Sequence, residues 1–428
     1  MPGRLNIFQR TMLQWNGLHP YNAVNVVRIP GAMDLELLRN VINTTLQAWG
    51  LTCLTINRKS GHFHYHRAAV QCEIKIIAAG ENLPVVEIER QINTAFDTGA
   101  RFNPFRFFAA HGKKSFALGL VYFHSIADDG SVMLLLKEIV DIYLGKNPAG
   151  SSAPVELYLA CHDRLLRHHP GLLARKLAAI PSLVSDMKNS SRPPCRDSQN
   201  MDNGFDFFSM KPETLKSLLK TAKSWGVTLN DLFLAILMKC FSPLADGRRK
   251  TAGRRKISIG CIVNARKDIG LHDRRNFGLF LGLFTVSLEV PDEVSVKNLA
   301  KEIRRQTREI KRKRLYLGTP LEMAFGRLLF PWLSNARKTK LFRQSFPLWG
   351  GITNMNLNSL WDQHDETKPS DYFRAVSTGP AVPFVLSVTT FNDVVNIGVS
   401  FRTSIFSAAE IERIKAGFLK MSGQMEAA

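Results

Sequence analysis

Residues 116–131 have the sequence FALGLVYFHSIADDGS, and this stretch decides the fold. Residues 116–123 form an apolar run that is typical of a buried strand, and residues 132–144 have the apolar spacing of an amphipathic helix. His124 therefore lies in the turn from a strand to a helix, where a side chain can reach a cleft. Imidazole is the side chain best suited to take a proton near neutral pH, so His124 is a candidate catalytic base.

The length and charge of the chain limit what it can be. Its 428 residues are enough for two sizeable hydrophobic cores. The hydrophobic content of 45% is normal for a globular protein. The 57 Lys and Arg against 36 Asp and Glu give a formal net charge of +21, which favours an anionic partner such as an acidic protein, a phosphate-bearing cofactor, nucleic acid or an anionic membrane.

Cysteine usage and hydropathy bear on the compartment. The six cysteines are scattered without a CxxC pair, which argues against a zinc site or a disulfide framework and fits a reducing compartment. The N-terminus lacks the apolar core of a signal peptide, and no apolar run reaches the roughly 18 residues that a membrane-spanning helix needs. We therefore expect a soluble, cytoplasmic protein that is still able to contact a membrane surface.

Helix and strand patterns follow one another along both halves without a repeat, which predicts an α+β fold. Residues 189–204 are polar, contain two prolines and lack periodicity, so we interpret them as a linker between a first lobe, 1–188, and a second lobe, 205–428. The predicted strands are 21–29, 51–57, 62–66, 116–123, 256–263, 277–290, 383–388 and 394–401; the predicted helices are 35–49, 85–96, 132–144, 157–187 (one or two helices), 212–225, 228–241, 294–315 and 408–421.

The strand, the His motif and the helix together resemble the HHxxxDG signature of the chloramphenicol-acetyltransferase-like acyltransferases. Within them, the chain is most similar to stand-alone condensation domains of nonribosomal peptide synthetases. Further segments match the family in order along nearly the whole chain, although only the His motif is specific. They are TAFD at 94–97 with PFR at 104–106, VTLND at 227–231, NAR at 264–266, NFGLF at 276–280 and GITN at 351–354.

The resemblance implies a fold and a reaction. Each lobe would have the fold of an acetyltransferase monomer, and the two would form a V-shaped pseudo-dimer with His124 in the middle of a central tunnel. An acyl group would pass to an amine or hydroxyl acceptor from a phosphopantetheine thioester on an acidic acyl or peptidyl carrier protein, or from coenzyme A. His124 would be the general base, Asn354 and Ser387 would lie at the tunnel or second-lobe site, and Asp128 would shape the loop through an arginine. The protein would act as a monomer, with no permanently bound cofactor.

The motif departs from the family pattern at three places. Phe123 stands where the first His is expected, and Asp129 stands where the Gly is expected, with Gly130 one place later as the residue that permits the tight turn. A carboxylate at position 129 is expected to raise the pKa of His124 or to alter the loop. The early strand at 51–54 contains no arginine to pair with Asp128, so Arg106 and Arg266 are the candidate partners.

Two features admit other uses. His62, His64 and His66 share one face of a predicted strand, which suits a metal, but an exposed hairpin explains them better and we predict no metal site. Residues 329–333 (LFPWL) either pack in the core, touch a membrane or cover an acyl chain.

Basic residues cluster at 248–256, 301–314 and 337–340. A solvated face explains such clusters about as well as a docking surface for an acidic carrier protein or for the phosphates of coenzyme A. Nucleic-acid binding usually brings a recognisable module or exposed stacking aromatic residues, and the sequence shows neither, so we predict no nucleic-acid partner.

Two functions of different classes lead, and nucleic-acid binding driven by charge alone is a third, weaker alternative. The first is a stand-alone condensation-type acyltransferase that forms an amide or an ester, and the absence of G-x-S-x-G and HExxH elements agrees with it. The second is a non-catalytic condensation-like protein that docks carrier proteins or recruits tailoring enzymes. Asp129 in the Gly position favours the second function, whereas the retained His124 favours the first.

Overall fold

The computed structural model describes the chain as two compact units. The described residues are 1–428 apart from 69–70, 79–83, 113, 147–154, 158–168, 272–275, 321, 324–333, 335–336, 338–346, 363 and 426–428, and apart from the side chains of 247–252. Unit 1 comprises Met1–His168, Asn264–Leu281 and Asn356–Ser377, and unit 2 comprises His169–Val263, Gly282–Met355 and Thr378–Ala428.

These units differ from a single division of the chain at 189–204. Helix α6 (Leu172–Asn189) belongs to unit 2, and two segments from the second half of the chain belong to unit 1. Strand β14 (Asp371–Val376) joins unit 1 because it pairs antiparallel with β2 (Asn22–Pro30) over six residues, from Asp371↔Arg28 to Val376↔Ala23. Pairing between such distant segments leaves no trace in local composition, which is why a linker search does not find it.

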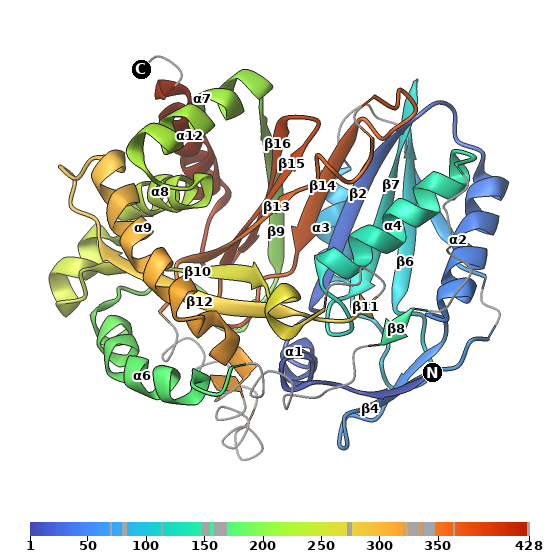
Figure 1. The fold of residues 1–428 in the computed structure, drawn as a ribbon, viewed down its shortest axis with the longest axis horizontal. Coiled ribbons are helices and arrows are strands. Elements are labelled where there is room, and N and C mark those ends of the chain that lie inside the picture. The colour runs from blue at the N-terminus through green and yellow to red at the C-terminus, as the bar shows by residue number, and fades with distance from the viewer. Residues whose placement is uncertain are drawn as a thin grey trace. The chain divides into compact units, whose positions relative to one another are not determined.

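Unit 1 is built on a five-stranded sheet of order β14-β2-β7-β6-β5. Its other elements are β1 (Pro2–Arg4), α1 (Ile7–Asn16), α2 (Leu35–Trp49), β3 (Leu54–Ile56), β4 (His62–Tyr65), β5 (Ile74–Ile77), α3 (Val85–Asn93), β6 (Phe105–His111), β7 (Ser115–Phe123), α4 (Asp129–Tyr143), β8 (Glu156–Leu157), η1 (Lys267–Ile269) and β11 (Asn276–Phe277). Neighbouring strands of the sheet are antiparallel except β5 and β6, which are parallel. Helices α2 and α4 pack on the face that is in front in Figure 1, and α3 lies behind β2.

The predicted elements around the His motif are confirmed. The apolar run at 116–123 is the central strand β7, in which Leu118, Leu120 and Val121 have no exposed surface. The predicted helix 35–49 is α2; the side chain of Asp34 caps its first turn, and Gly50 ends it in the left-handed conformation (φ 71°) that glycine adopts without strain.

Unit 2 contains a six-stranded sheet of order β12-β10-β13-β15-β16-β9. A hairpin turn at Asn392 and Asp393 joins β15 and β16, and both turn residues have positive φ. The elements are β9 (Asn203–Met210), α7 (Pro212–Trp225), α8 (Leu229–Ala252), β10 (Lys256–Asn264), β12 (Leu281–Glu289), α9 (Val296–Arg312), η2 (Leu315–Gly318), β13 (Gly350–Asn356), β15 (Phe384–Phe391), β16 (Val394–Arg402) and α12 (Ala408–Gln424). Sheets and helices in each unit give the predicted α+β class.

Two predicted elements need correction. The strand predicted at 277–290 is interrupted after Phe277, because the backbone of Gly278 bonds to the His-motif turn and not to a neighbouring strand. Within the predicted helix 157–187, Leu157 lies in the short strand β8, which pairs with β11, and the described helix is α6; residues 158–168 lie outside the described residues.

Among the described residues, no single helix is long and apolar enough to cross a membrane. The pair α7 and α8 passes the same test only when taken together, and it is bent by 99°. The residues of α8 from Leu232 to Met238 have no exposed surface, so this part of the helix is apolar on all sides because it lies in the core of unit 2.

Candidate active site

His124 lies in the turn that joins β7 to α4, within unit 1. Its side chain is 8% exposed, and its backbone N–H donates to the carbonyl oxygen of Tyr21 over 3.3 Å. The Tyr21 ring stacks on the imidazole with 5.3 Å between centroids, and the Tyr122 ring meets it edge-on at 5.5 Å. Two aromatic rings therefore fix the plane of the imidazole and keep most water away from it.

The hydrogen bond of Nδ1 determines which nitrogen of His124 carries the proton. Nδ1 lies 3.0 Å from the carbonyl oxygen of Ala127. Because a carbonyl oxygen only accepts, this contact requires the proton on Nδ1. Among the described residues no group hydrogen-bonds to Nε2, which therefore keeps its lone pair available.

Burial keeps His124 neutral. Desolvation lowers the pKa of His124 below its ordinary value of 6.5, and it outweighs the opposing effects of Asp129, of the Ala127 carbonyl and of Asp128. Asp129 acts on the pKa of this histidine in the expected, upward direction, but the larger effect of burial makes the net shift downward. At neutral pH the imidazole is uncharged and able to accept a proton.

Asp128 is held at every side by hydrogen bonds. Its carboxylate accepts two from the guanidinium of Arg266 (Nη2–Oδ1 2.7 Å, Nη1–Oδ2 3.0 Å), one from the N–H of Ser131 (2.9 Å) and one from the N–H of Phe280 (2.9 Å). Its own N–H donates to the carbonyl oxygen of Gly278 (3.0 Å). The side chain is 1% exposed, so this bidentate pair is a buried one that ties the His-motif turn to the segment Asn264–Leu281.

Arg266 and not Arg106 is the partner of Asp128. The guanidinium of Arg106 donates to the carbonyl oxygens of Ala95, Gln91 and Thr94 and lies 4.0 Å from the centre of the Phe96 ring. It therefore fastens α3 to β6, and Arg106 is a wrong candidate for this ion pair.

Asp129 occupies the place of the expected glycine without a steric conflict, because it is the first residue of α4. Its carboxylate accepts hydrogen bonds from the hydroxyl of Tyr122 (2.8 Å) and from Nη1 of Arg374 on β14 (2.6 Å). The Arg374 side chain is 2% exposed and that of Asp129 is 22% exposed. The buried guanidinium balances the added carboxylate, so Asp129 belongs to a second ion pair of the loop.

Gly130 is required for space and not for backbone freedom. It lies in the first turn of α4 and is not among the glycines with positive φ, which corrects the expectation of a permissive turn. A Cβ atom at this position would lie 2.8 Å from Nη1 of Arg266. The guanidinium thus reaches Asp128 across the position of Gly130, and a larger residue there would force the guanidinium to shift.

Asn354 and Ser387 belong to unit 2. Asn354 lies exposed on β13. Ser387 is 2% exposed on β15 and faces Gly398 of β16 across the sheet. A tunnel site that includes these two residues stays a prediction.

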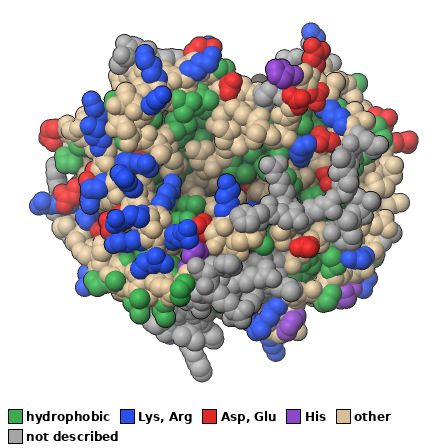
Figure 2. Space-filling model, in the orientation of Figure 1, with side chains coloured by type: hydrophobic (Ala, Val, Ile, Leu, Met, Phe, Trp, Pro, Cys, Tyr) green, Lys and Arg blue, Asp and Glu red, His purple; other side chains and the backbone are tan. Residues whose placement is uncertain are grey.

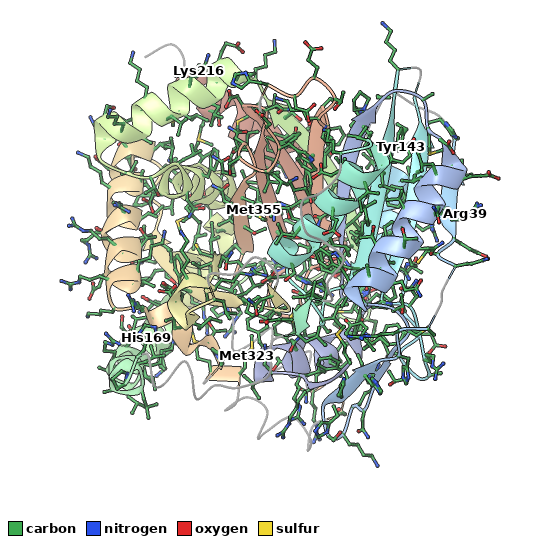
Figure 3. All side chains as sticks on the ribbon, turned by 45° about the vertical axis from the view of Figure 1, so that its right-hand side comes forward. Arg39, Tyr143, His169, Lys216, Met323 and Met355 are labelled. Atoms are coloured by element: carbon green, nitrogen blue, oxygen red, sulfur yellow. The ribbon has the colours of Figure 1, made fainter. Side chains whose placement is uncertain are left out.

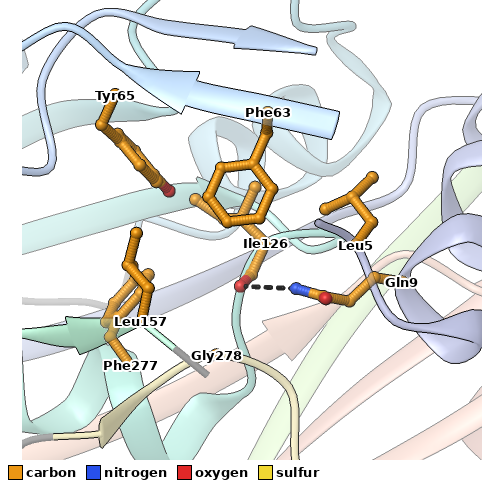
Figure 4. Close-up of a pocket in the computed structure, with 8 residues that line it drawn as sticks. All are labelled: Leu5, Gln9, Phe63, Tyr65, Ile126, Leu157, Phe277 and Gly278. Atoms are coloured by element: carbon orange, nitrogen blue, oxygen red, sulfur yellow. Dashed lines mark hydrogen bonds between the residues drawn. The ribbon is translucent and has the colours of Figure 1, made fainter. Parts of the chain in front are cut away.

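A small cavity lies beside the His-motif turn, lined by Leu5, Gln9, Phe63, Tyr65, Ile126, Leu157, Phe277 and Gly278 (Figure 4). Nε2 of Gln9 donates to the carbonyl oxygen of Ile126 over 3.2 Å at its edge. The cavity leaves about 10 Å³ for the centre of a water-sized sphere, which admits one water molecule and no substrate. The cavity is therefore part of the packing around the His-motif turn.

Other predicted sites are placed as follows. His64 and His66 stack with 4.5 Å between ring centroids, and no group of three metal-ligating side chains occurs among the described residues. Residues 329–333 lie outside the described residues, as do most of the basic cluster 337–340 and the side chains of 247–252.

Sequence reasoning missed Tyr21 and Arg374. Tyr21 precedes a strand and has no motif around it. Arg374 could have been found from the sequence, since it is the one charged residue within the otherwise apolar stretch YFRAV of β14. A charged side chain in such a strand needs a buried partner of opposite charge.

Comparison with known proteins identifies the class. The family model described as Condensation domain matches residues 5–425, so the chain belongs to the condensation-domain family. A search of curated proteins found no match.

Solved structures share the fold at low sequence identity. The chain is similar over its full length to the condensation domain of the Monacolin K polyketide synthase MokA (12% identity, 98% of that chain, TM-score 0.71). It is also similar to the EpoB cyclization-docking bidomain from Sorangium cellulosum (13%, 85% of that chain, TM-score 0.70). A third match is the first condensation domain of the calcium-dependent antibiotic synthetase in complex with a substrate analogue (13%, 97% of that chain, TM-score 0.70). The two-lobed chloramphenicol-acetyltransferase-like fold predicted from the sequence is therefore confirmed.

Proposed function

We propose that this protein transfers an acyl group from a thioester to an amine or hydroxyl acceptor, with His124 as the general base. The observation that carries the proposal is the neutral imidazole whose Nδ1 proton is donated to Ala127, since this leaves Nε2 as the proton acceptor. Membership of the condensation-domain family supports condensation chemistry in general.

The other ionisable groups of the turn are already engaged, which supports His124 as the base. The carboxylate of Asp128 accepts four hydrogen bonds, and that of Asp129 is bonded to Arg374 and Tyr122. We propose that Asp128 is a positioning residue, because it holds the turn in which the imidazole lies.

The proposed reaction balances without another reagent. The acceptor nitrogen or oxygen attacks the thioester carbonyl while its proton passes to Nε2 of His124. The tetrahedral intermediate then collapses, the carbon–sulfur bond breaks, and the leaving thiolate takes the proton from the imidazolium. Burial of the imidazole favours both transfers, because a base with a pKa near or below neutrality gives its proton up again.

We further propose that the donor arrives on the phosphopantetheine of a carrier protein or as an acyl-coenzyme A. The carrier protein is the alternative that family membership supports, and the net charge of +21 suits an acidic carrier as well as the phosphates of coenzyme A. Whether the acceptor is an amine or an alcohol decides between an amide and an ester product.

The test compares wild type with His124→Ala. Octanoyl-coenzyme A and an octanoyl-loaded carrier protein serve as donors, octylamine and octanol serve as acceptors, and mass spectrometry detects the product. We expect His124→Ala to lower kcat/KM by about 10²-fold or more, the usual contribution of a general base. His111→Ala, at an exposed position at the end of β6, is the matched control and should behave as wild type.

Turnover of His124→Ala at the wild-type rate would contradict the proposed role of the imidazole. Absence of turnover in wild type together with measurable binding of the loaded carrier protein would instead support the docking function that Asp129 suggested.

A further inference from the structure

Helix α6 of unit 2 has an exposed apolar face. Leu173, Leu177, Ile180 and Val184 are 49%, 56%, 44% and 42% exposed, and their spacing places them on one side of the helix. Among the exposed residues from Leu173 to Val184, Ser182 is the only polar one. A contiguous aliphatic surface of this kind marks an interaction site.

Helix α9 of the same unit has a basic face. It contains seven basic and two acidic residues, and the two acidic ones, Glu302 and Glu309, pair within the helix or at its end with Arg305 and Lys313. Exposed basic residues recur along one side at positions that helical spacing aligns: Lys297, Lys301, Arg305, Arg308 and Arg312. This row, the α9 stripe, therefore has a large excess of positive charge.

The α9 stripe and the apolar face of α6 lie on the same side of unit 2. Helix α9 leads into η2, and α6 packs on η2, where Nζ of Lys176 donates to the carbonyl oxygen of Leu315 over 3.2 Å. Nη1 of Arg314 lies 3.0 Å from Nδ1 of His169. His169, which is labelled in Figure 3, precedes α6. Figure 2 shows blue side chains gathered over α9 and green ones directly below them over α6.

We propose that this surface docks unit 2 on an anionic lipid bilayer, with the aliphatic residues of α6 in the interface and the α9 stripe against the headgroups. Lipid offers both an apolar layer and negative charge, so it complements both halves of the surface at once. A second copy of the chain is disfavoured, because it would oppose two strongly basic faces. Nucleic acid complements the charge of the α9 stripe but offers no apolar surface to the four exposed aliphatic side chains of α6.

A hollow beside the α9 stripe has the size and chemistry for a headgroup. It holds about 580 Å³ between α9 and the end of α7 and is lined by Lys301, Arg304, Arg308 and Trp225 among others. Nζ of Lys297 lies 5.9 Å from the centre of the Trp225 ring. Basic residues suit a phosphate group, and a half-buried tryptophan is typical of residues at a membrane–water interface.

Vesicle sedimentation tests the proposal with the full-length chain. Vesicles of equal parts phosphatidylcholine and phosphatidylglycerol are compared with vesicles of phosphatidylcholine alone. We expect binding to the anionic vesicles to fall about 100-fold in Lys301→Ala/Arg308→Ala/Arg312→Ala, at about 1 kcal/mol per charge near the surface. Leu173→Ser/Leu177→Ser should weaken binding about tenfold or more, since it removes apolar groups from the interface.

Matched controls come from other helices of the same unit. Lys216→Ala/Lys220→Ala/Lys223→Ala on α7 removes as many exposed charges, and Leu219→Ser/Leu419→Ser removes as many exposed leucines; Lys216 is labelled in Figure 3. Both controls should bind the anionic vesicles within about threefold of wild type. All substituted positions are exposed, and circular dichroism checks that each variant is folded.

Three results would overturn the proposal. Equal binding to both kinds of vesicle would show that the positive charge of the α9 stripe does not contribute to binding. If the α6 variant binds vesicles as wild type does, the aliphatic residues play no part in binding. The surface would then be purely electrostatic, as in proteins that bind nucleic acid. A dimer in solution that the α6 variant converts to monomer, with no change in vesicle binding, would assign the apolar face to a second copy.

Discussion

Replacement of Arg266 by methionine tests the ion pair that holds the candidate active site. In Arg266→Met the carboxylate of Asp128, which is 1% exposed, loses both guanidinium hydrogen bonds but keeps those from the N–H groups of Ser131 and Phe280. Removal of one partner of a buried ion pair lowers stability by about 3–5 kcal/mol. Because two hydrogen-bond donors to the Asp128 carboxylate remain, we expect a loss near the lower figure. We therefore expect a local destabilisation of about 3 kcal/mol.

Hydrogen exchange is the appropriate assay, because a chain with two units need not unfold in one step. About 3 kcal/mol corresponds to exchange on the order of 100-fold faster for the amides of the first turn of α4. Arg305→Met on α9 is the matched control: its ion pair with Glu302 is 66% and 40% exposed, and an exposed pair contributes about 0–1 kcal/mol. An increase of less than about threefold in Arg266→Met would refute the view that this pair holds the turn.

Three further substitutions probe the same loop. Gly130→Ala should lower the Tm in thermal scanning, because the added Cβ displaces the guanidinium of Arg266. Overpacking destabilises a protein by about 1–3 kcal/mol, which exceeds the stability that the helix propensity of alanine adds. A raised Tm would contradict the close approach of the guanidinium to position 130. Arg374→Met leaves Asp129 without its cation, so the pKa of His124 should rise in an NMR titration, and an unchanged pKa would show that this pair does not act on the imidazole. Ser131→Ala removes the hydroxyl that accepts a hydrogen bond from Arg266 (2.6 Å) and bonds to the backbone of Gly278. This change should lower the free energy of unfolding by about 1–3 kcal/mol, and wild-type stability would mean that a water molecule replaces the hydroxyl.

The elements around His124 were predictable because their signals are local. An apolar run of strand length, a polar turn and a helix of regular spacing specify β7 and α4 without help from the rest of the chain. The hairpin at Asn392 and Asp393 was predictable for the same reason, since its turn residues tolerate positive φ.

The contacts that complete the site were not predictable, because they join segments far apart in the chain. Arg266 lies 138 residues from Asp128, and Arg374 lies 245 residues from Asp129. Sequence reasoning left two candidates for the partner of Asp128, and only the fold selects Arg266. The same limit applies to the boundaries of the units, which depend on the pairing of β14 with β2.

The net pKa of His124 also required the structure. From the sequence, a carboxylate at position 129 predicts a raised value, because proximity is visible in the sequence and burial is not. The fold buries the imidazole between Tyr21 and Tyr122, and the cost of desolvating its charged form outweighs the carboxylate.

The protonation state of His124 is the central claim, and ¹⁵N NMR of histidine-labelled protein tests it most directly. The chain has 11 histidines, and the signal that disappears in His124→Gln identifies the residue. The account predicts a neutral Nδ1–H tautomer at pH 7 and a pKa below 6.5, so that the stability contributed by the neutral form is complete above pH 6.5 and is lost as the pH falls through the lowered pKa. An Nε2–H tautomer, or an imidazole that is still charged at pH 7, would contradict it.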